Sequence, residues 1–262
     1  MDFHQKVFIV TGASQGIGKE LAYQLLQQNA QLIITGRNED RLRLAKEELS
    51  LLGAVEYVVA DMGVWEDCQR VADFPLTQYG KIDGIIHNAG MSAFGKVADM
   101  KREVIDEIIN TNLRGVLYLT NLVLPAIRAQ KGSVLFVGSI AGLHGLPDYS
   151  LYSLTKMSLT ALAQSLHVEE AANGVFVGVA HIGFTENEAV KKTLNANGQP
   201  VDVPLRNALL TNSRQVTASS ILKQLKRKKY WKLHCKVGLA NHFMVRFFPR
   251  VLFAIFKWNY KG

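Results

Sequence analysis

Two kinds of hydrophobic pattern alternate along the first 180 residues of the chain. Short runs of branched and aromatic residues, such as Val7-Phe-Ile-Val10, are separated by longer segments in which apolar residues recur every three or four positions, as at Leu21 and Leu25. The first pattern is typical of buried strands and the second of amphipathic helices. The predicted strands cover residues 7–10, 31–35, 55–60, 84–87, 133–137 and 175–180. This alternation predicts an α/β fold in which one doubly wound parallel sheet is covered by helices on both faces.

The composition fits one domain that spans residues 1–262. Of the 262 residues, 48% are hydrophobic, which allows a large buried core. Cys68 and Cys235 lie far apart and outside any cluster with metal-ligand spacing, so we expect free thiols, no metal and a reducing, cytoplasmic compartment. We expect neither a signal peptide nor a membrane-spanning helix, because residues 6–12 already fit a strand entering a turn and no run of about 18 apolar residues occurs.

The net charge of +8 is concentrated at the C-terminal end of the chain. Residues 214–262 contain twelve Lys or Arg and no Asp or Glu, so the first 213 residues hold 18 basic and 22 acidic side chains. In the C-terminal extension, residues 230–262, aromatic and aliphatic side chains are interleaved with these cations. Three ways of covering them remain open: packing against the substrate pocket, packing against a second subunit, or contact with an anionic membrane surface. No nucleic-acid-reading motif is present, so a nucleic-acid partner is not expected.

A glycine-rich turn follows the first predicted strand. In Thr11-Gly-Ala-Ser-Gln-Gly-Ile-Gly18 the three glycines permit, in order, a tight turn, a close approach of the backbone to a pyrophosphate, and close packing of the next helix. The start of that helix offers N–H groups and positive dipole to the same phosphates. We therefore expect a dinucleotide cofactor. The candidate binding residues of this turn are Gly12, Ser14, Gln15, Gly16, Ile17 and Gly18.

Residues at the carboxyl ends of the following strands are candidates for the remaining cofactor contacts. Arg37 stands where an acidic residue would bind the ribose of NAD, and an arginine there accommodates the 2′-phosphate of NADP. NADP(H) is therefore favoured over NAD(H). Asp61, followed by Met62, ends the third strand, where a carboxylate can meet the adenine amine. The turn Asn88-Ala89-Gly90 brings little side-chain bulk beside the cofactor.

Tyr152 and Lys156 are the candidates for acid–base chemistry. They stand one turn apart on one face of a predicted helix, and no other of the eight tyrosines has a lysine four residues on. An unperturbed phenol has a pKa of about 10, so a nearby ammonium is needed to stabilise the phenolate near neutral pH. The same spacing occurs in ordinary amphipathic helices, so the assignment depends on the nucleotide turn upstream. Ser139 and Thr185 also lie at strand ends, where such sheets bind ligands.

The ordered set of these motifs resembles the short-chain dehydrogenase/reductase family over residues 5–190. The resemblance implies a Rossmann-type sheet, a homodimer or homotetramer, and hydride transfer between a nicotinamide and a carbonyl or alcohol. It implies that Tyr152 is the acid/base, that Ser139 holds the reacting oxygen, and that Asn112 binds a water of the proton relay. Lys156 would lower the pKa of the phenol and, with Tyr152, contact the cofactor. The matching motifs are the turn 11–18, His87-Asn88-Ala89-Gly90, Asn112, Ser139, and Tyr152 with Lys156.

The chain departs from that family's pattern at four places, one of which is Gln15, where many NADP-preferring relatives carry a basic side chain, so Arg37 is the main argument for NADP. His87 replaces the first Asn of Asn-Asn-Ala-Gly, which we expect to change a hydrogen bond between sheet and helix. Ile182-Gly183 replaces Pro-Gly beside the nicotinamide, with Gly183 kept as a cofactor contact. Thr185 lies closer to Gly183 than the family's carboxamide-binding Thr, and Asn187 stands at the later position, so both remain candidates.

Residues 186–212 form an insertion before a helix expected from about Val216, and in this family such segments cap the substrate pocket. The insertion holds few charges, and His144 and Tyr149 are candidates to line the pocket. A lipophilic carbonyl or alcohol therefore fits better than a phosphorylated sugar. The predicted function is an NADP(H)-dependent oxidoreductase. The alternative is an NADPH-sensing binding protein that uses the same fold without turnover, and the four filled catalytic positions favour the enzyme.

Overall fold

The computed structural model describes residues 2–186, 192–203 and 210–260. Within them, seven parallel strands form one sheet in the order β10-β7-β6-β4-β1-β2-β3. Its strands are β1 Val7–Thr11, β2 Gln31–Gly36, β3 Val55–Val59, β4 Gly84–His87, β6 Ser133–Ser139, β7 Phe176–Ile182 and β10 Trp231–Leu233. The helices are α1 Gly16–Leu26, α2 Glu39–Leu49, α3 Trp65–Tyr79, α4 Arg102–Ile109, α5 Gly115–Ala129, α6 Ser150–Glu169, α7 Arg214–Lys226, α8 Lys236–Phe247 and α9 Pro249–Asn259.

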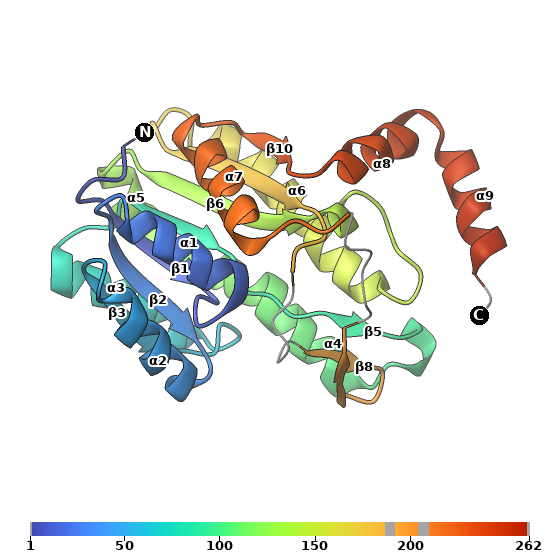
Figure 1. Cartoon of the computed structure of the whole chain (residues 1–262), viewed down its shortest axis with the longest axis horizontal. Helices are drawn as coiled ribbons and strands as arrows, with labels where there is room; N and C mark the ends of the chain where they lie inside the picture. The colour runs from blue at the N-terminus through green and yellow to red at the C-terminus, as the bar shows by residue number, and fades with distance from the viewer. Residues whose placement is uncertain (1, 187–191, 204–209, 261–262) are drawn as a thin grey trace.

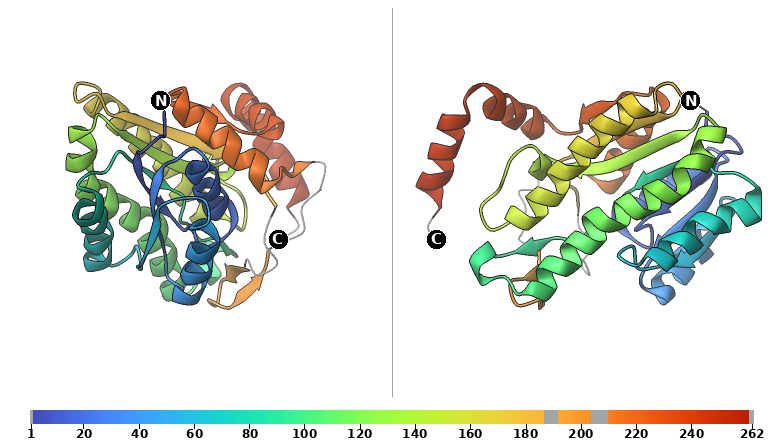
Figure 2. Two further views of the ribbon diagram at one scale, coloured as in Figure 1. Left: turned by 60° about the vertical axis from the view of Figure 1, so that its left-hand side comes forward. Right: turned by 180° about the vertical axis from the view of Figure 1, so that it is seen from behind.

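Helices cover both faces of the sheet because the strands are apolar on both sides (Figures 1 and 2). Successive side chains of a strand point to opposite faces. In β1, Phe8 and Val10 pack in the cluster built by α1, α2 and α7, whereas Ile9 packs in the cluster built by α3, α5 and α6. The predicted doubly wound α/β fold is therefore confirmed.

The order of the strands reverses between β1 and β4. From β1 the chain moves through β2 to β3 on one side, and from β4 through β6 and β7 to β10 on the other. In parallel sheets of this kind, ligands bind in the crevice outside the carboxyl ends at the point of reversal. The turn after β1 and the turn after β4 both lie at this edge, because the two strands pair in parallel with Val10 opposite Ile86.

A second, small sheet was not predicted from the sequence. It consists of β5 Ala93–Phe94, β8 Lys192–Asn195 and β9 Pro200–Asp202, so the described part of the predicted cap, 186–212, pairs with the segment that follows β4. Leu194 N donates to Ser92 O at 3.0 Å. Residues 187–191 and 204–209 of the cap lie outside the described residues. Leu194 packs against a buried cluster that includes Val104 of α4 and Leu151 of α6.

The C-terminal extension forms the last strand at the sheet edge and two helices that project from the body (Figure 1). Helices α8 and α9 meet at an angle of 113°. Among the described residues, no single helix is long and apolar enough to cross a membrane, although this bent pair meets the length and composition criteria together. The helix predicted from about Val216 begins at Arg214, because the Ser213 side chain accepts a hydrogen bond from Val216 N at 3.2 Å.

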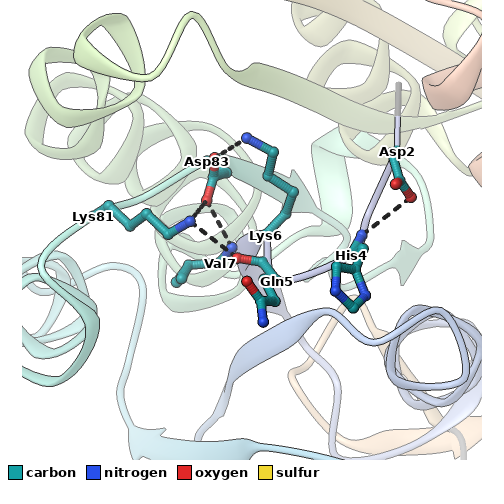
Figure 3. Close-up of polar contacts among 7 residues, drawn as sticks. All are labelled: Asp2, His4, Gln5, Lys6, Val7, Lys81 and Asp83. Atoms are coloured by element: carbon teal, nitrogen blue, oxygen red, sulfur yellow. Dashed lines mark hydrogen bonds and ion pairs between the residues drawn. The ribbon is translucent and has the colours of Figure 1, made fainter.

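A buried carboxylate fixes the opposite edge of the sheet (Figure 3). Asp83 precedes β4, and its side chain accepts from Lys6 Nζ at 2.7 Å and from Val7 N at 2.9 Å. Lys81 Nζ lies 3.1 Å from the same carboxylate. Burial alone would raise the pKa of Asp83, but the two ammonium groups and the Val7 N–H outweigh burial and lower the pKa. Asp83 thereby ties the start of β1 to the start of β4.

Candidate active site

The glycine turn has the shape that a pyrophosphate requires. Gly12 and Gly16 adopt positive φ values of 65° and 62°, which favour glycine. A Cβ on Gly18 would lie 2.2 Å from Gly12 O, so only glycine lets α1 approach β1 this closely. A Cβ on Gly16 would meet nothing within 4 Å, so the turn opens outward at the start of α1. The Gln15 side chain does not cap this helix, so the N–H groups at its start can bind a dinucleotide phosphate.

Thr11 locks this turn to the one after β4. Its hydroxyl oxygen accepts from the backbone N–H groups of Asn88 and Ala89, both at 3.0 Å. The Asn88 side chain returns the contact by donating to Thr11 O at 3.0 Å and to Gly12 O at 3.1 Å. The two predicted cofactor loops therefore form one rigid unit at the carboxyl edge of the sheet.

Asn112 lies in a π-helical turn, Asn110–Arg114, between α4 and α5. Such turns are frequent at functional sites. The Asn112 side chain clamps the backbone of Met91: its oxygen accepts from Met91 N and its amide donates to Met91 O, each at 2.8 Å. The amide also donates to Thr155 Oγ1 of α6 at 3.1 Å. Asn112 thus joins the loop after β4 to the helix that carries Tyr152 and Lys156.

Tyr152 and Lys156 lie one turn apart on α6, as predicted. The Lys156 Nζ atom is 5.8 Å from the centre of the Tyr152 ring. The lysine is only 5% exposed, and its ammonium donates to Val137 O of β6 at 3.0 Å. A Cβ on Gly90 would lie 3.3 Å from the same Nζ and 3.4 Å from Asn112 Oδ1. The absence of a side chain at Gly90 therefore leaves room for the ammonium beside the cofactor loop.

Ser139 ends β6, and its hydroxyl oxygen accepts from Ala141 N at 3.1 Å at the start of a 3-10 turn, Ile140–Gly142. This turn rests on α6: a Cβ on Gly142 would lie 2.7 Å from Lys156 O. Gly142 is thus required for the close packing that holds Ser139 near α6, the helix that carries Tyr152 and Lys156. The main-chain oxygen of Ser139 also accepts from His181 Nδ1 at 3.1 Å if that nitrogen carries the proton.

The candidates for the adenosine end have polar partners within the protein. Arg37 pairs with Glu107 of α4, with 3.0 Å between Nη1 and Oε1, and both side chains are partly exposed. Asp61 Oδ1 accepts from Gly63 N at 2.8 Å. A Cβ on Gly115 would lie 2.2 Å from Met62 O, so the backbone after β3 packs directly on the start of α5.

The two nicotinamide-side candidates occupy a tightly packed corner. A Cβ on Gly183 would lie 2.5 Å from Cys235 Sγ, so the C-terminal extension presses on the end of β7 here. The Thr185 hydroxyl lies 3.1 Å from the Thr217 hydroxyl of α7, and Thr185 is buried. Asn187, the other candidate for the carboxamide contact, lies outside the described residues.

Two histidines have surroundings that the sequence did not reveal. His87 is buried, stacks on Phe136 and contacts the Thr120 hydroxyl of α5 at 3.0 Å, which supplies the altered hydrogen bond between sheet and helix. Burial lowers the pKa of His87 to about 3, so the ring is neutral. His144, a pocket candidate, is buried against the C-terminal helices, where Nε2 lies 2.8 Å from Asn241 Nδ2 and 3.1 Å from Asn241 Oδ1.

Four contributors to the site were missed by the sequence analysis. Thr11 stands in the predicted turn, but its contacts to Asn88 and Ala89, like those of Gly142 and Thr155, join residues that are distant in sequence, and no local pattern marks such contacts. Arg41 is the fourth: its Nη1 donates to Gln15 Oε1 at 3.1 Å, which places a second guanidinium beside the glycine turn. The only indication of this second guanidinium in the sequence was that Arg41 follows Arg37 by four residues.

Residues 6–198 match the short chain dehydrogenase family. The chain belongs to this family. An uncharacterized oxidoreductase from Staphylococcus epidermidis is 32% identical over 190 residues, which cover 72% of this chain and 82% of the relative. An 11-beta-hydroxysteroid dehydrogenase-like protein, 4A, from Arabidopsis thaliana is 34% identical over 188 residues, which cover 69% of this chain. The matched region spans only 62% of the length of that relative.

Solved structures of short-chain dehydrogenases share the fold. One from Burkholderia phymatum, in complex with NAD, superposes with a TM-score of 0.83 and 20% identity over 96% of each chain. L-Sorbose reductase from Gluconobacter frateurii, complexed with NADPH and L-sorbose, superposes with a TM-score of 0.68 and 24% identity over 71% of this chain and 73% of that one. The former likeness extends across nearly all of the chain, whereas the family match ends at residue 198.

Proposed function

We propose that this short-chain dehydrogenase is an NADP(H)-dependent oxidoreductase that interconverts a carbonyl and a secondary alcohol on a lipophilic substrate. The observation that carries the proposal is the buried Lys156 ammonium, one turn from Tyr152 and beside Gly90 of the cofactor loop. A buried cation stabilises a neighbouring phenolate and so suits a tyrosine that exchanges protons near neutral pH. When bound, the nicotinamide supplies or accepts the hydride.

In the reducing direction, the Tyr152 hydroxyl donates its proton to the substrate oxygen as the carbonyl carbon gains the hydride. The Ser139 hydroxyl donates a hydrogen bond to the same oxygen and holds it in place. Lys156 stabilises the phenolate left on Tyr152. Asn112 positions Met91 through its amide, and the second lone pair of its side-chain oxygen remains for the water through which the phenolate regains its proton. Oxidation of the alcohol runs these steps backward.

Preference for NADP(H) is proposed from Arg37, supported by Arg41 at the neighbouring Gln15. Arg37 must exchange Glu107 for the 2′-phosphate, so Glu107→Gln is expected to favour NADP, whereas Arg37→Asp is expected to shift the preference toward NAD. Fluorescence titration with both cofactors measures the ratio of the two dissociation constants. Arg43→Asp is the control, because Arg43 lies on the following helix α2 and pairs with Glu47. An unchanged ratio in Arg37→Asp would refute the assignment.

A lipophilic substrate is proposed from the apolar cluster that contains Leu151, the residue before Tyr152. Leu151 and Val104 are buried in it, and Leu194 of the cap packs against it. The names of the Arabidopsis thaliana relatives, which refer to a hydroxysteroid, agree with this chemistry. A homodimer or homotetramer is also proposed, supported by the exposed Leu154 and Met157 on α6, and sedimentation velocity measures its mass. The cytoplasmic location remains a prediction.

The decisive experiment follows absorbance at 340 nm with a panel of lipophilic ketones and alcohols. Wild-type turnover with a more than hundredfold loss in Tyr152→Phe is expected, because removal of a positioned acid/base costs roughly 10²–10⁴ in rate. Tyr118→Phe is the matched control, since that tyrosine lies on α5 and contacts Arg114 rather than α6. Turnover that survives Tyr152→Phe would refute the mechanism. Cofactor binding without turnover of any substrate would favour the alternative of an NADPH-sensing protein.

A further inference from the structure

Helices α8 and α9 expose an apolar surface that the body of the protein leaves uncovered. Trp258 is 88% exposed and Phe247 is 64% exposed. Leu239, Phe243 and Ile255 are also exposed, and Phe243 contacts Phe247 with 4.9 Å between ring centres. Single exposed apolar residues are common, but a group of them on each of two adjoining helices indicates a binding surface.

The exposed residues recur at helical spacing. In α8 they are Leu239, Phe243 and Phe247, each one turn after the last. In α9, Val251, Ile255 and Trp258 form a second exposed stripe, whereas Leu252 and Phe256 on another face turn toward the body. Helix α9 is therefore apolar on two sides, of which the fold covers one. The second side needs a partner.

Basic side chains flank both stripes. Arg246 of α8 and Arg250 and Lys257 of α9 are exposed. Within the described part of the chain, none of the three forms an ion pair. The chain has no Asp or Glu from residue 214 onward, so both helices lack carboxylates of their own. The partner of this surface must therefore bring apolar contact and negative charge together.

We propose that α8 and α9 dock on the surface of an anionic phospholipid bilayer. The apolar stripes enter the boundary between headgroups and acyl chains, and the flanking cations bind lipid phosphates. A second copy of the chain is a poorer partner, because a symmetric contact would bring the same cations together with no carboxylate between them. A membrane surface supplies both apolar contact and negative charge. The residues that would touch it are already exposed, so the fold need not change.

Docking would also bring the active-site loop close to the lipid. The loop 140–149 leads from Ser139 toward Tyr152, and it touches the docking helices through His144, which contacts Asn241 of α8 and packs against the ring of Phe256 of α9. The Tyr260 hydroxyl donates to Asp148 Oδ1 at 2.9 Å. A lipophilic substrate would therefore enter from the bilayer beside this loop. This consequence rests on the proposed function, whereas docking itself does not.

Sedimentation of the full chain with vesicles tests the proposal. Binding to phosphatidylglycerol vesicles at low salt is expected, with much weaker binding to phosphatidylcholine vesicles or in 1 M salt. Replacing the three cations together, Arg246→Gln, Arg250→Gln and Lys257→Gln, is expected to weaken binding about 100-fold, at about 1 kcal/mol per cation and 1.4 kcal/mol per tenfold. The control replaces Arg43, Lys101 and Lys131 by Gln, which removes the same charge from exposed positions elsewhere.

Tryptophan fluorescence reports the apolar contact. Vesicles should shift the emission of the wild type to shorter wavelength, and Trp258→Phe should lose the shift while Val168→Ser, an exposed apolar change on α6, keeps it. Absence of binding to anionic vesicles at low salt would overturn the proposal, as would equal loss in both triple variants. A lighter assembly of Trp258→Ser without vesicles would assign the surface to a second copy instead. Vesicle binding requires no turnover, and turnover of a water-soluble ketone requires no vesicles, so each proposal can fail alone.

Discussion

Replacement of Asp83 by asparagine should destabilise the protein far more than the loss of an exposed ion pair. The Asp83 side chain is 1% exposed and accepts hydrogen bonds from Lys6, Val7 and Lys81 (Figure 3). Asparagine keeps the size of the side chain and an oxygen that can accept from Val7 N. It loses the charge that both lysines neutralise, at the point where the starts of β1 and β4 are joined.

The size of the effect follows from the exposure of the partners. Hydrogen bonds to charged groups contribute roughly 1.5–3 kcal/mol each, and removing one partner of a fully buried ion pair costs about 3–5 kcal/mol. Lys6 and Lys81 are 38% and 31% exposed, so both ammonium groups can return to water and the upper end of this range does not apply. We expect a loss of about 3 kcal/mol in the free energy of unfolding, or roughly 6–12 °C in Tm for a chain of this size.

Urea unfolding followed by circular dichroism measures this difference. Glu48→Gln, which breaks the exposed pair with Lys19, is the control and should cost less than about 1 kcal/mol. Because the pKa of Asp83 is lowered on folding, its contribution is present above about pH 4 and is lost as the pH falls through the folded value. The two curves of stability against pH should therefore converge below pH 4. A cost equal to that of Glu48→Gln, with a gap that does not change with pH, would refute the role given to Asp83.

Two further predictions concern histidines and the C-terminal helices. Burial lowers the pKa of both His87 and His234 to about 3, so between pH 6.5 and 3 the unfolded chain binds more protons than the folded chain. As the pH falls through this range, the free energy of unfolding should decrease by about 1.4 kcal/mol per pH unit for each histidine. His87→Asn should remove the share of His87 from this slope in urea titrations at pH 5 and 6, while the shares of His234 and of His181, whose pKa burial also lowers, remain; an unchanged slope would contradict the assignment. Tyr260→Phe removes the hydrogen bond to Asp148, so amide exchange of residues 143–149 should speed up several-fold by mass spectrometry, whereas equal exchange would show that the contact does not restrain the loop.

Elements with a strong local signal were predictable, and those built by distant partners were not. Six of the seven strands of the main sheet coincide with predicted runs to within about two residues, because buried parallel strands are continuous apolar runs. The strands β5 and β8 are short and depend on the contact of Ser92 with Thr193, 101 positions along the chain. The π-helical turn at Asn112 and the packing of Gly142 on α6 likewise depend on neighbours that the sequence does not place.

The tyrosine and lysine were predictable for a further reason: both lie on one helix, so their separation is set by local geometry. Ser139 is a different case, because its position relative to α6 is fixed by Lys156 bonding Val137 and by the fit of Gly142. For Arg37, the sequence predicted a cation at the right strand end but not its pairing with Glu107. The proposed binding of NADP(H) by Arg37 would therefore require it to leave Glu107, which only the folded arrangement reveals.

The proposed catalytic residues and the helices that contact the loop 140–149 lie in different parts of the chain. Asn112, Ser139, Tyr152 and Lys156 all lie within residues 6–198, the part that matches the family. The loop between Ser139 and Tyr152, however, is held from outside that region, by Asn241 and Phe256 against His144. We infer that residues 6–198 supply the acid–base groups and the residues that bind the cofactor. The C-terminal extension would set the shape of the loop beside the substrate. Changes in α8 and α9 should therefore alter KM for large substrates more than kcat, since they displace the loop without touching the phenol.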